Sequence, residues 1–124
     1  MKFISQSIPE VILIEPNIIN DNRGYFIETY KKDIINKFLG YKTEFVQDNE
    51  SKSSNGVLRG LHYQLYPFTQ AKLVRVAQGK VLVVAVDIRK KSKTFSKYVS
   101  QEICSEKKKT TIYTSWFCSW FCCS

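Results

Sequence analysis

Residues 72–89, KLVRVAQGKVLVVAVDIR, constrain the fold more than any other stretch of the chain. Two apolar runs, LVRV and VLVVAVDI, flank the turn residues AQGK, and this pattern predicts a β-hairpin. The second run is apolar on both faces at residues 83–86, so this strand needs cover on both sides, as inside a sandwich or a barrel. The stretch therefore favours a layered β-protein.

Further short strand patterns recur along the chain, at residues 11–16, 25–30, 43–49, 57–64 and 97–103. The residues DNRG, 21–24, have turn chemistry, because Asp and Asn accept local backbone hydrogen bonds and Gly tolerates a positive φ. One short helix is expected in KKDIINKFLG, residues 31–40, which carries apolar side chains on one face and a glycine in the stop position. Many short strands with little helix indicate an all-β sandwich, jelly roll or barrel.

Length and charge narrow the classes of function. The 124 residues suffice for one domain with a core, and the formal net charge of +8 favours anionic partners. The lysines are scattered and form no basic stripe interleaved with aromatics, so we expect no nucleic-acid partner; a small phosphorylated ligand fits better. We expect no membrane partner and a cytoplasmic location, because the sequence has neither a signal-peptide pattern nor an apolar run long enough to span a bilayer.

The stretch RGLHYQ, residues 59–64, holds His62, the single histidine of the chain. From the residues alone it has two readings. One is a packed or surface histidine with no chemical role, and the other is a general base, since imidazole titrates near neutral pH. A metal site is disfavoured, because a second histidine and a Cys/Asp/Glu cluster at ligand spacing are both missing from the sequence.

Four stretches taken together resemble the dTDP-4-dehydrorhamnose 3,5-epimerase family: DNRGYFIE, FVQDNESKSSNGVLRGLHYQ, QAKLVRVAQGKV and VAVDIRKKSKTF. The resemblance runs in order from about Val11 to about Glu106. It implies a cupin-type jelly roll, which is a double-stranded β-sandwich, and a homodimer that uses no cofactor and no metal. It also implies an isomerase of dTDP-rhamnose and deoxysugar biosynthesis, which supplies cell-surface polysaccharides.

The resemblance further implies the chemistry. The substrate would be dTDP-4-keto-6-deoxyglucose, whose C4 ketone acidifies the hydrogens at C3 and C5. His62 matches the catalytic base, and Lys72 matches a lysine near the C4 oxygen, where a cation stabilises a developing enolate. The expected substrate-binding residues are Arg23 and Arg59 at the diphosphate, and Phe26, Glu28, Gln47 and Asn49 around the nucleotide and sugar. The chain departs from the family pattern at Ile19, where an aromatic is common, and at Val83, where an acidic residue is common.

The resemblance stops after Glu106, where the family pattern should continue through a segment like YIPxGFAHGF to a tyrosine acid and an aspartate that orients the histidine. The chain instead reads TTIYTSWFCSWFCCS, which holds both tryptophans and three of the four cysteines. Read one nucleotide later, codons for WFCSWFC can encode GFAHGFV, and Ile112 to Ser115 allow YIPR. The adenine-rich codons of Lys107–Lys109 are the expected slip point.

We therefore expect two regions: an incomplete, C-terminally truncated jelly-roll domain at 1–106 and an out-of-frame tail at 107–124. The other reading is a genuine apolar tail for membrane or partner contact. Without the acid, the aspartate and the closing strands, the chain as written is expected to be catalytically inactive, with an unpaired sheet edge. The alternative function is a non-catalytic jelly roll that binds a sugar nucleotide, or a pseudogene product.

Overall fold

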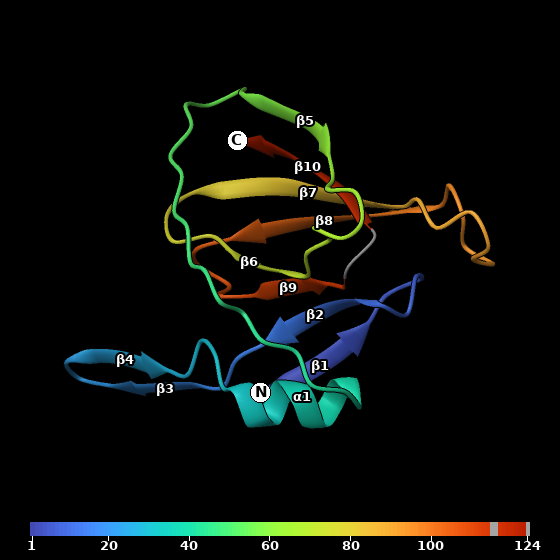
Figure 1. The fold of residues 1–124 in the computed structure, drawn as a ribbon. Helices are drawn as coiled ribbons and strands as arrows, with labels where there is room; N and C mark the ends of the chain where they lie inside the picture. Colours follow the sequence, from blue (N-terminus) through green and yellow to red (C-terminus); the bar gives the residue numbers. More distant parts are fainter. Residues whose placement is uncertain (115–116, 124) are drawn as a thin grey trace.

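A computed structural model describes residues 1–114 in full and the backbone of residues 117–123, which it arranges as two four-stranded antiparallel β-sheets and a two-stranded hairpin (Figure 1). The first sheet has the spatial order β1 (Lys2–Ser5), β2 (Val11–Glu15), β9 (Thr110–Tyr113), β6 (Lys72–Arg75). The second has the order β5 (Leu58–His62), β10 (Phe117–Cys123), β7 (Lys80–Asp87), β8 (Tyr98–Cys104). The separate hairpin pairs β3 (Ile18–Asp21) with β4 (Gly24–Ile27). The expected all-β sandwich with one short helix is confirmed.

The first sheet is covered on both faces, because alternate residues of its strands enter two different apolar clusters. Val11 of β2 and Tyr113 of β9 face the second sheet, where they pack with Val83, Ala85 and other side chains of β7 and β8. The cluster on the other face includes Ile12 and Ile112, which pack against the helix. The core therefore has three layers, formed by the helix, the first sheet and the second sheet.

The helix α1 (Lys32–Leu39) forms where the apolar spacing predicts it. Ile35 is buried in the cluster beneath the first sheet, and the ring of Phe38 stacks on Phe3 with centroids 4.4 Å apart. The helix ends at Gly40, whose φ of 76° is left-handed and whose N–H donates to the carbonyl of Asn36. The sequence therefore encodes both the buried face of this helix and its end.

Two expectations from local pattern are wrong. β6 and β7 are strands, but they are not a hairpin: β6 pairs with β9 in the first sheet, and β7 pairs with β8 and β10 in the second. The turn between them carries the chain from one layer to the other. Residues 43–49 form no strand; they run as an exposed extended segment between α1 and β5 (Figure 1), and Val46 is 88% exposed. An alternation of apolar and polar residues does not predict which strand will pair with the segment, or whether any strand will.

The region from residue 107 supplies one strand to each sheet, which the sequence does not anticipate. β9 lies between β2 and β6, and β10 lies between β5 and β7, where Phe117 is opposite Asp87 and Ser119 is opposite both Ala85 and His62. β10 therefore fills the second sheet between β5 and β7, where the expected truncation would have left a sheet edge unpaired.

The loop after β7 is held by a partly buried charge network that links the two sheets. Asp87 is completely buried and accepts hydrogen bonds from Arg89 Nε at 2.9 Å and Nη2 at 2.8 Å, and from Thr94 Oγ1 at 2.7 Å. Arg89 Nη1 also donates to Glu10 Oε1 at 2.6 Å, in the turn between β1 and β2. The Arg89 guanidinium holds the pKa of the Asp87 carboxyl far below its usual range, and lowers the pKa of Glu10.

Candidate active site

His62 is the last residue of β5, an outer strand of the second sheet whose register with β10 places His62 opposite Ser119. Its ring atom Nδ1 lies 3.0 Å from the carbonyl oxygen of Gly60, two residues earlier on the same strand. A carbonyl oxygen can only accept a hydrogen bond, so this contact requires the proton on Nδ1. The lone pair of the neutral imidazole is then on Nε2.

Lys72 is the first residue of β6, in the other sheet, and its Nζ lies 3.2 Å from His62 Nε2. An ammonium nitrogen can only donate, so Nε2 accepts this hydrogen bond. The two sheets thus bring a proton-accepting nitrogen and a cation together at an exposed position of the sandwich. This is the arrangement that removal of a proton next to a carbonyl group needs: a base for the proton and a positive charge for the oxygen of the enolate.

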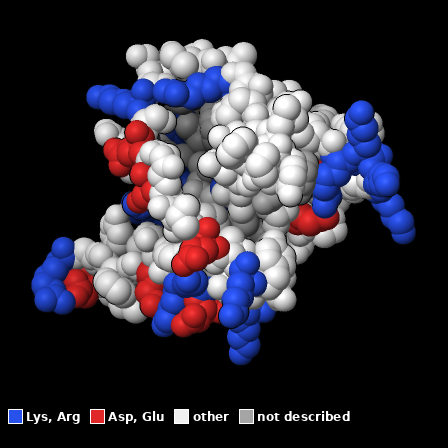
Figure 2. Space-filling view, in the orientation of Figure 1, with Lys and Arg blue, Asp and Glu red and all other residues white. Residues whose placement is uncertain are grey.

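Arg59 also lies on β5, but its guanidinium turns toward the segment that precedes the strand. Nε and Nη2 donate to Ser53 Oγ at 3.0 and 2.8 Å, and Nη2 contacts the carbonyl oxygen of Lys52 at 3.5 Å. Gln47 and Asn49 lie in the same exposed segment and are joined by a hydrogen bond of 3.1 Å from Gln47 Nε2 to Asn49 Oδ1. The face shown in Figure 2 is hollowed beside this segment.

Arg23, Phe26 and Glu28 are not brought to His62 within this chain. They lie on or beside the β3–β4 hairpin, which projects from the end of the molecule opposite β5 (Figure 1). Arg23 caps the hairpin turn by donating to Asp21 Oδ2 from Nη2 at 2.6 Å, which lowers the pKa of that carboxyl, and Glu28 is paired with Lys31 at 3.4 Å. Phe26 is 63% exposed.

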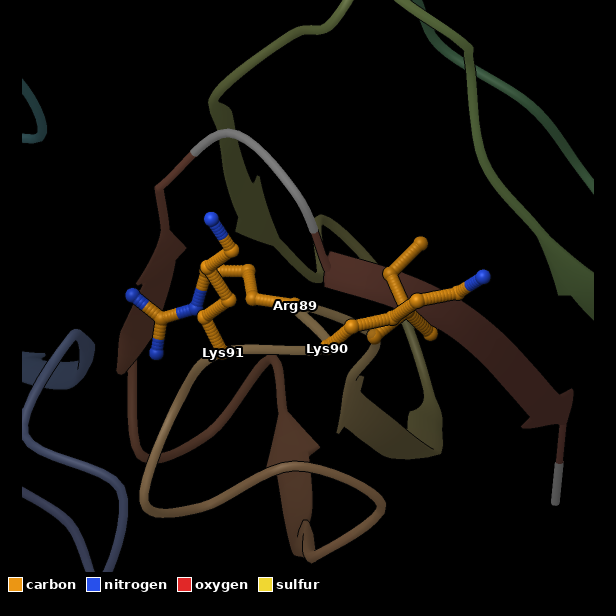
Figure 3. A pocket seen from close by; sticks show the side chains of 4 residues that line it. Arg89, Lys90 and Lys91 are labelled. Atoms are coloured by element: carbon orange, nitrogen blue, oxygen red, sulfur yellow. The ribbon is translucent and has the colours of Figure 1, made fainter.

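Positive side chains occur as separate groups on the face in Figure 2, with acidic groups between several of them. One shallow hollow is lined by Ile88, Arg89, Lys90 and Lys91 on the β7–β8 loop, where Lys90 extends away from the Arg89 guanidinium (Figure 3). This hollow does not include His62. In the part of the chain that the structure describes, no three His, Cys, Asp or Glu side chains gather as a metal site, and no helix has the length and apolar character to cross a membrane.

Sequence reasoning missed two features of the described core. The first is the Asp87–Arg89–Glu10 network, whose partners are 79 residues apart. The second is Tyr113, whose buried hydroxyl has no hydrogen-bond partner among the described residues and whose pKa is raised by that burial. The short spacing of Asp87 and Arg89 in the stretch VDIR was the one available signal for the first feature, and the sequence holds no signal for the second.

Comparison with known proteins gives a consistent result. A family model described as dTDP-4-dehydrorhamnose 3,5-epimerase matches residues 5–123. A curated protein of that name from Shigella flexneri is 50% identical over 109 residues, which are 88% of this chain and 60% of the relative. The crystal structure of the Elizabethkingia anophelis enzyme aligns with a TM-score of 0.95 and 41% identity, covering 99% of this chain and 67% of that one.

A second solved structure carries a ligand. The Legionella pneumophila enzyme, crystallised with dTDP-4-keto-L-rhamnose, aligns with a TM-score of 0.93 and 43% identity, covering 98% of this chain and 64% of that one. The expected cupin-type jelly roll is confirmed by these structural relatives. The chain spans about 60% of the length of the curated relatives from Shigella flexneri and Salmonella typhimurium.

Proposed function

The chain belongs to the dTDP-4-dehydrorhamnose 3,5-epimerase family, and from this premise we propose that the protein inverts C3 and C5 of dTDP-4-keto-6-deoxyglucose. The C4 ketone makes the hydrogens on its two neighbouring carbons acidic. A base removes each proton, the enolate is held by a nearby cation, and an acid returns a proton to the opposite face. The reaction needs no redox cofactor, because no electrons leave the sugar.

The observation that carries this proposal is the pairing of His62 with Lys72. Nε2 of His62 is the ring nitrogen left to accept a proton once Gly60 holds Nδ1–H, and the Lys72 ammonium is 3.2 Å away. A cation at this place stabilises negative charge on the C4 oxygen as the C–H bond breaks. Catalytic roles for these two residues, and substrate-binding roles for Arg23, Phe26, Glu28, Gln47, Asn49 and Arg59, are part of the proposal.

A homodimer is the second part of the proposal, because the expected site residues lie at opposite ends of one chain. The β3–β4 hairpin exposes Ile19 and Phe26 at 64% and 63%, and β5 exposes Leu58 and Leu61 at 62% and 55%. Apolar strands with this exposure are typical of surfaces that a partner covers. We propose that the hairpin of one copy reaches the His62 site of the other. Sedimentation of wild type and of Phe26→Asp tests this, and an unchanged dimer in the variant would contradict it.

We place the protein in the cytoplasm, because its proposed substrate carries a nucleotide diphosphate, and such a charged group does not cross a membrane unaided. The proposed product serves the assembly of cell-surface polysaccharides that contain deoxysugars.

We also propose that residues from about 107 onward are an out-of-frame reading of a longer jelly-roll domain. The support comes from the codons and not from the fold, since Phe117–Cys123 is largely apolar as written and WFCSWFC becomes GFAHGFV in the shifted frame. Resequencing the gene through the codons of Lys107–Lys109 tests this. A surplus or missing nucleotide there supports it, and an intact frame refutes it.

The second candidate function is binding of the sugar nucleotide without catalysis, which is favoured by the loss of the family pattern after Glu106. Solvent deuterium distinguishes the two functions, since a binder cannot exchange carbon-bound hydrogens. The substrate is incubated in D2O with the 124-residue chain, and separately with the protein encoded by the corrected frame. We expect deuterium at C3 and C5 with the corrected protein, little or none with the 124 residues, and none with a corrected His62→Gln variant. Absence of label with the corrected protein would refute the epimerase.

A further inference from the structure

The loop between β7 and β8, residues 88–97, carries four lysines that have no part in the candidate active site. All four are exposed, and none forms an ion pair with another described residue: Lys90, Lys91, Lys93 and Lys97. The sequence from residue 88 to residue 101 contains no Asp or Glu. Asp87 and Glu10, at the base of the loop, are already paired with Arg89. This basic loop therefore has positive charge that no described side chain offsets.

The backbone of the basic loop is held in shape by hydrogen bonds at its base and within its turns. The N–H of Asp87 donates to the carbonyl of Lys97 at 3.0 Å, and the N–H of Ser96 donates to the carbonyl of Asp87 at 2.9 Å. Within the loop, the N–H of Ser92 donates to the carbonyl of Arg89 at 2.9 Å. The lysines are thus carried on an ordered backbone, so a partner does not have to order the loop when it binds.

The basic loop projects from the second sheet beyond the rest of the fold (Figure 1), and positive side chains gather at this end of the molecule (Figure 2). The hollow beside it is shallow, and Lys90 extends away from the Arg89 guanidinium (Figure 3). Arg89 is itself engaged by two carboxylates. Cations that diverge in this way do not enclose one small anion. They fit a broad surface on which many negative groups lie side by side.

Exposed aromatic rings accompany these lysines. Phe95, in the loop, is 46% exposed, and Tyr98, the first residue of β8, is 65% exposed. Lysines together with aromatic side chains are typical of protein surfaces that lie on lipid, because the ammonium groups meet the headgroups and the rings enter the boundary with the acyl chains. A projecting loop can also reach a flat bilayer without obstruction from the rest of the molecule.

We propose that the basic loop binds an anionic lipid surface, with its lysines among the phosphate headgroups and Phe95 at the boundary with the acyl chains. The contact is peripheral. The expectation of no membrane partner rests on the lack of a spanning or signal segment, and a loop that binds headgroups needs neither. The proposal does not depend on the epimerase function, because none of its residues belongs to the candidate active site.

Sedimentation with lipid vesicles measures this binding. The 124-residue chain is mixed at low salt with vesicles of equimolar phosphatidylcholine and phosphatidylglycerol, and separately with vesicles of phosphatidylcholine alone. We expect binding to the anionic vesicles only, and its loss at about 1 M salt, where the screening length falls to about 3 Å. Equal binding to both kinds of vesicle overturns the proposal.

Two double variants of equal total charge locate the contact. Each lysine close to an anionic surface strengthens binding about fivefold, so Lys90→Gln with Lys91→Gln should weaken it about 25-fold. The matched control, Lys37→Gln with Lys42→Gln, removes two exposed lysines from α1 and the segment after it, and should weaken binding far less. All four side chains are exposed, so neither change should affect folding. Equal losses in the two variants overturn the proposal, because only total charge would then matter.

One further variant and one further ligand distinguish lipid from nucleic acid. Phe95→Ala should weaken vesicle binding severalfold, since it removes a ring from the boundary of the bilayer. Vesicle binding as tight as that of wild type overturns the placement of Phe95 and the choice of lipid with it. A single-stranded oligonucleotide replaces the vesicles in a second titration. If it binds through Lys90 and Lys91 while anionic vesicles leave the protein in solution, the partner is a nucleic acid and the lipid proposal is wrong.

Discussion

Removing the guanidinium of Arg89 should be among the most damaging single substitutions that this chain offers. Asp87 is fully buried, and two of its hydrogen bonds come from the Arg89 side chain. In Arg89→Met the carboxylate would keep the hydroxyl of Thr94 and the backbone N–H of residue 89, but it would lose its counter-charge. The variant therefore leaves an ionised group in the core without the cation that offsets its desolvation.

The size of the loss follows from this geometry. Breaking a buried ion pair by removing one partner costs about 3–5 kcal/mol. The Arg89 side chain is 27% exposed and two donors to Asp87 remain, so we expect the lower end, about 3 kcal/mol. This is a large share of the roughly 5–15 kcal/mol that stabilises a domain, and it corresponds to a fall in Tm of roughly 10 °C for a chain of this length.

Urea unfolding of three proteins measures the effect: wild type, Arg89→Met and the control Lys90→Met. Lys90 is the next residue and is exposed, so its variant should stay within about 0.5 kcal/mol of wild type. A fourth protein carries both Asp87→Leu and Arg89→Met, so that apolar side chains replace the ion pair. This double variant should recover most of the free energy of unfolding that Arg89→Met loses, because the Asp87 charge is no longer buried without a partner. A loss below about 1 kcal/mol in Arg89→Met, or no recovery in the double variant, would refute the reasoning.

The dependence on pH gives an independent check. The folded pKa of Asp87 lies below its unfolded value, because Arg89 donates to the carboxylate. Its ionisation therefore contributes stability that is fully present above about pH 5 and is lost as the pH falls through the unfolded value, near 3.9, toward the folded one. In Arg89→Met that contribution is gone, so the difference from wild type should shrink on acidification. A difference that is constant from neutral to acid pH would exclude this cause.

Two further predictions concern single residues of the core and of a helix end. Tyr113→Phe removes a buried hydroxyl that has no partner in the described part of the chain, so it should leave stability unchanged or raise it by up to about 1 kcal/mol in thermal unfolding. A clear loss of stability would show that the hydroxyl is bonded. Gly40→Ala places a side chain at a φ of 76° and should cost about 1 kcal/mol, whereas the matched Gly60→Ala, where φ is not positive and the added methyl meets nothing within 4 Å, should cost less; equal costs would contradict the role of the left-handed end.

The candidate site could be predicted from the sequence only in part. The stretch RGLHYQ makes His62 a candidate base, and the family resemblance adds its expected role, Lys72 and the proposed ligand-binding residues. Their roles stay predictions. The structure brings His62 and Lys72 to 3.2 Å, and it puts Arg23, Phe26 and Glu28 on a hairpin at the other end of the chain. Sequence spacing does not encode either outcome, because each depends on where whole strands lie.

The sequence by itself determined the local elements. Apolar runs bounded by turn residues predicted β2, β5, β6, β7 and β8, and the spacing of Ile35 and Leu39 with Gly40 after them predicted α1 and its end. Such signals are local: side-chain alternation and the φ that glycine allows act over a few residues.

The tertiary structure alone decided which strands pair. It separated β6 from β7, left residues 43–49 without a partner strand, and joined Asp87 to Glu10 through Arg89 across the two sheets. The physical reason is that a strand with two apolar faces can form its backbone hydrogen bonds with any of several neighbouring strands. The choice among them depends on which arrangement of strands buries the most apolar surface, and that is a property of the whole chain.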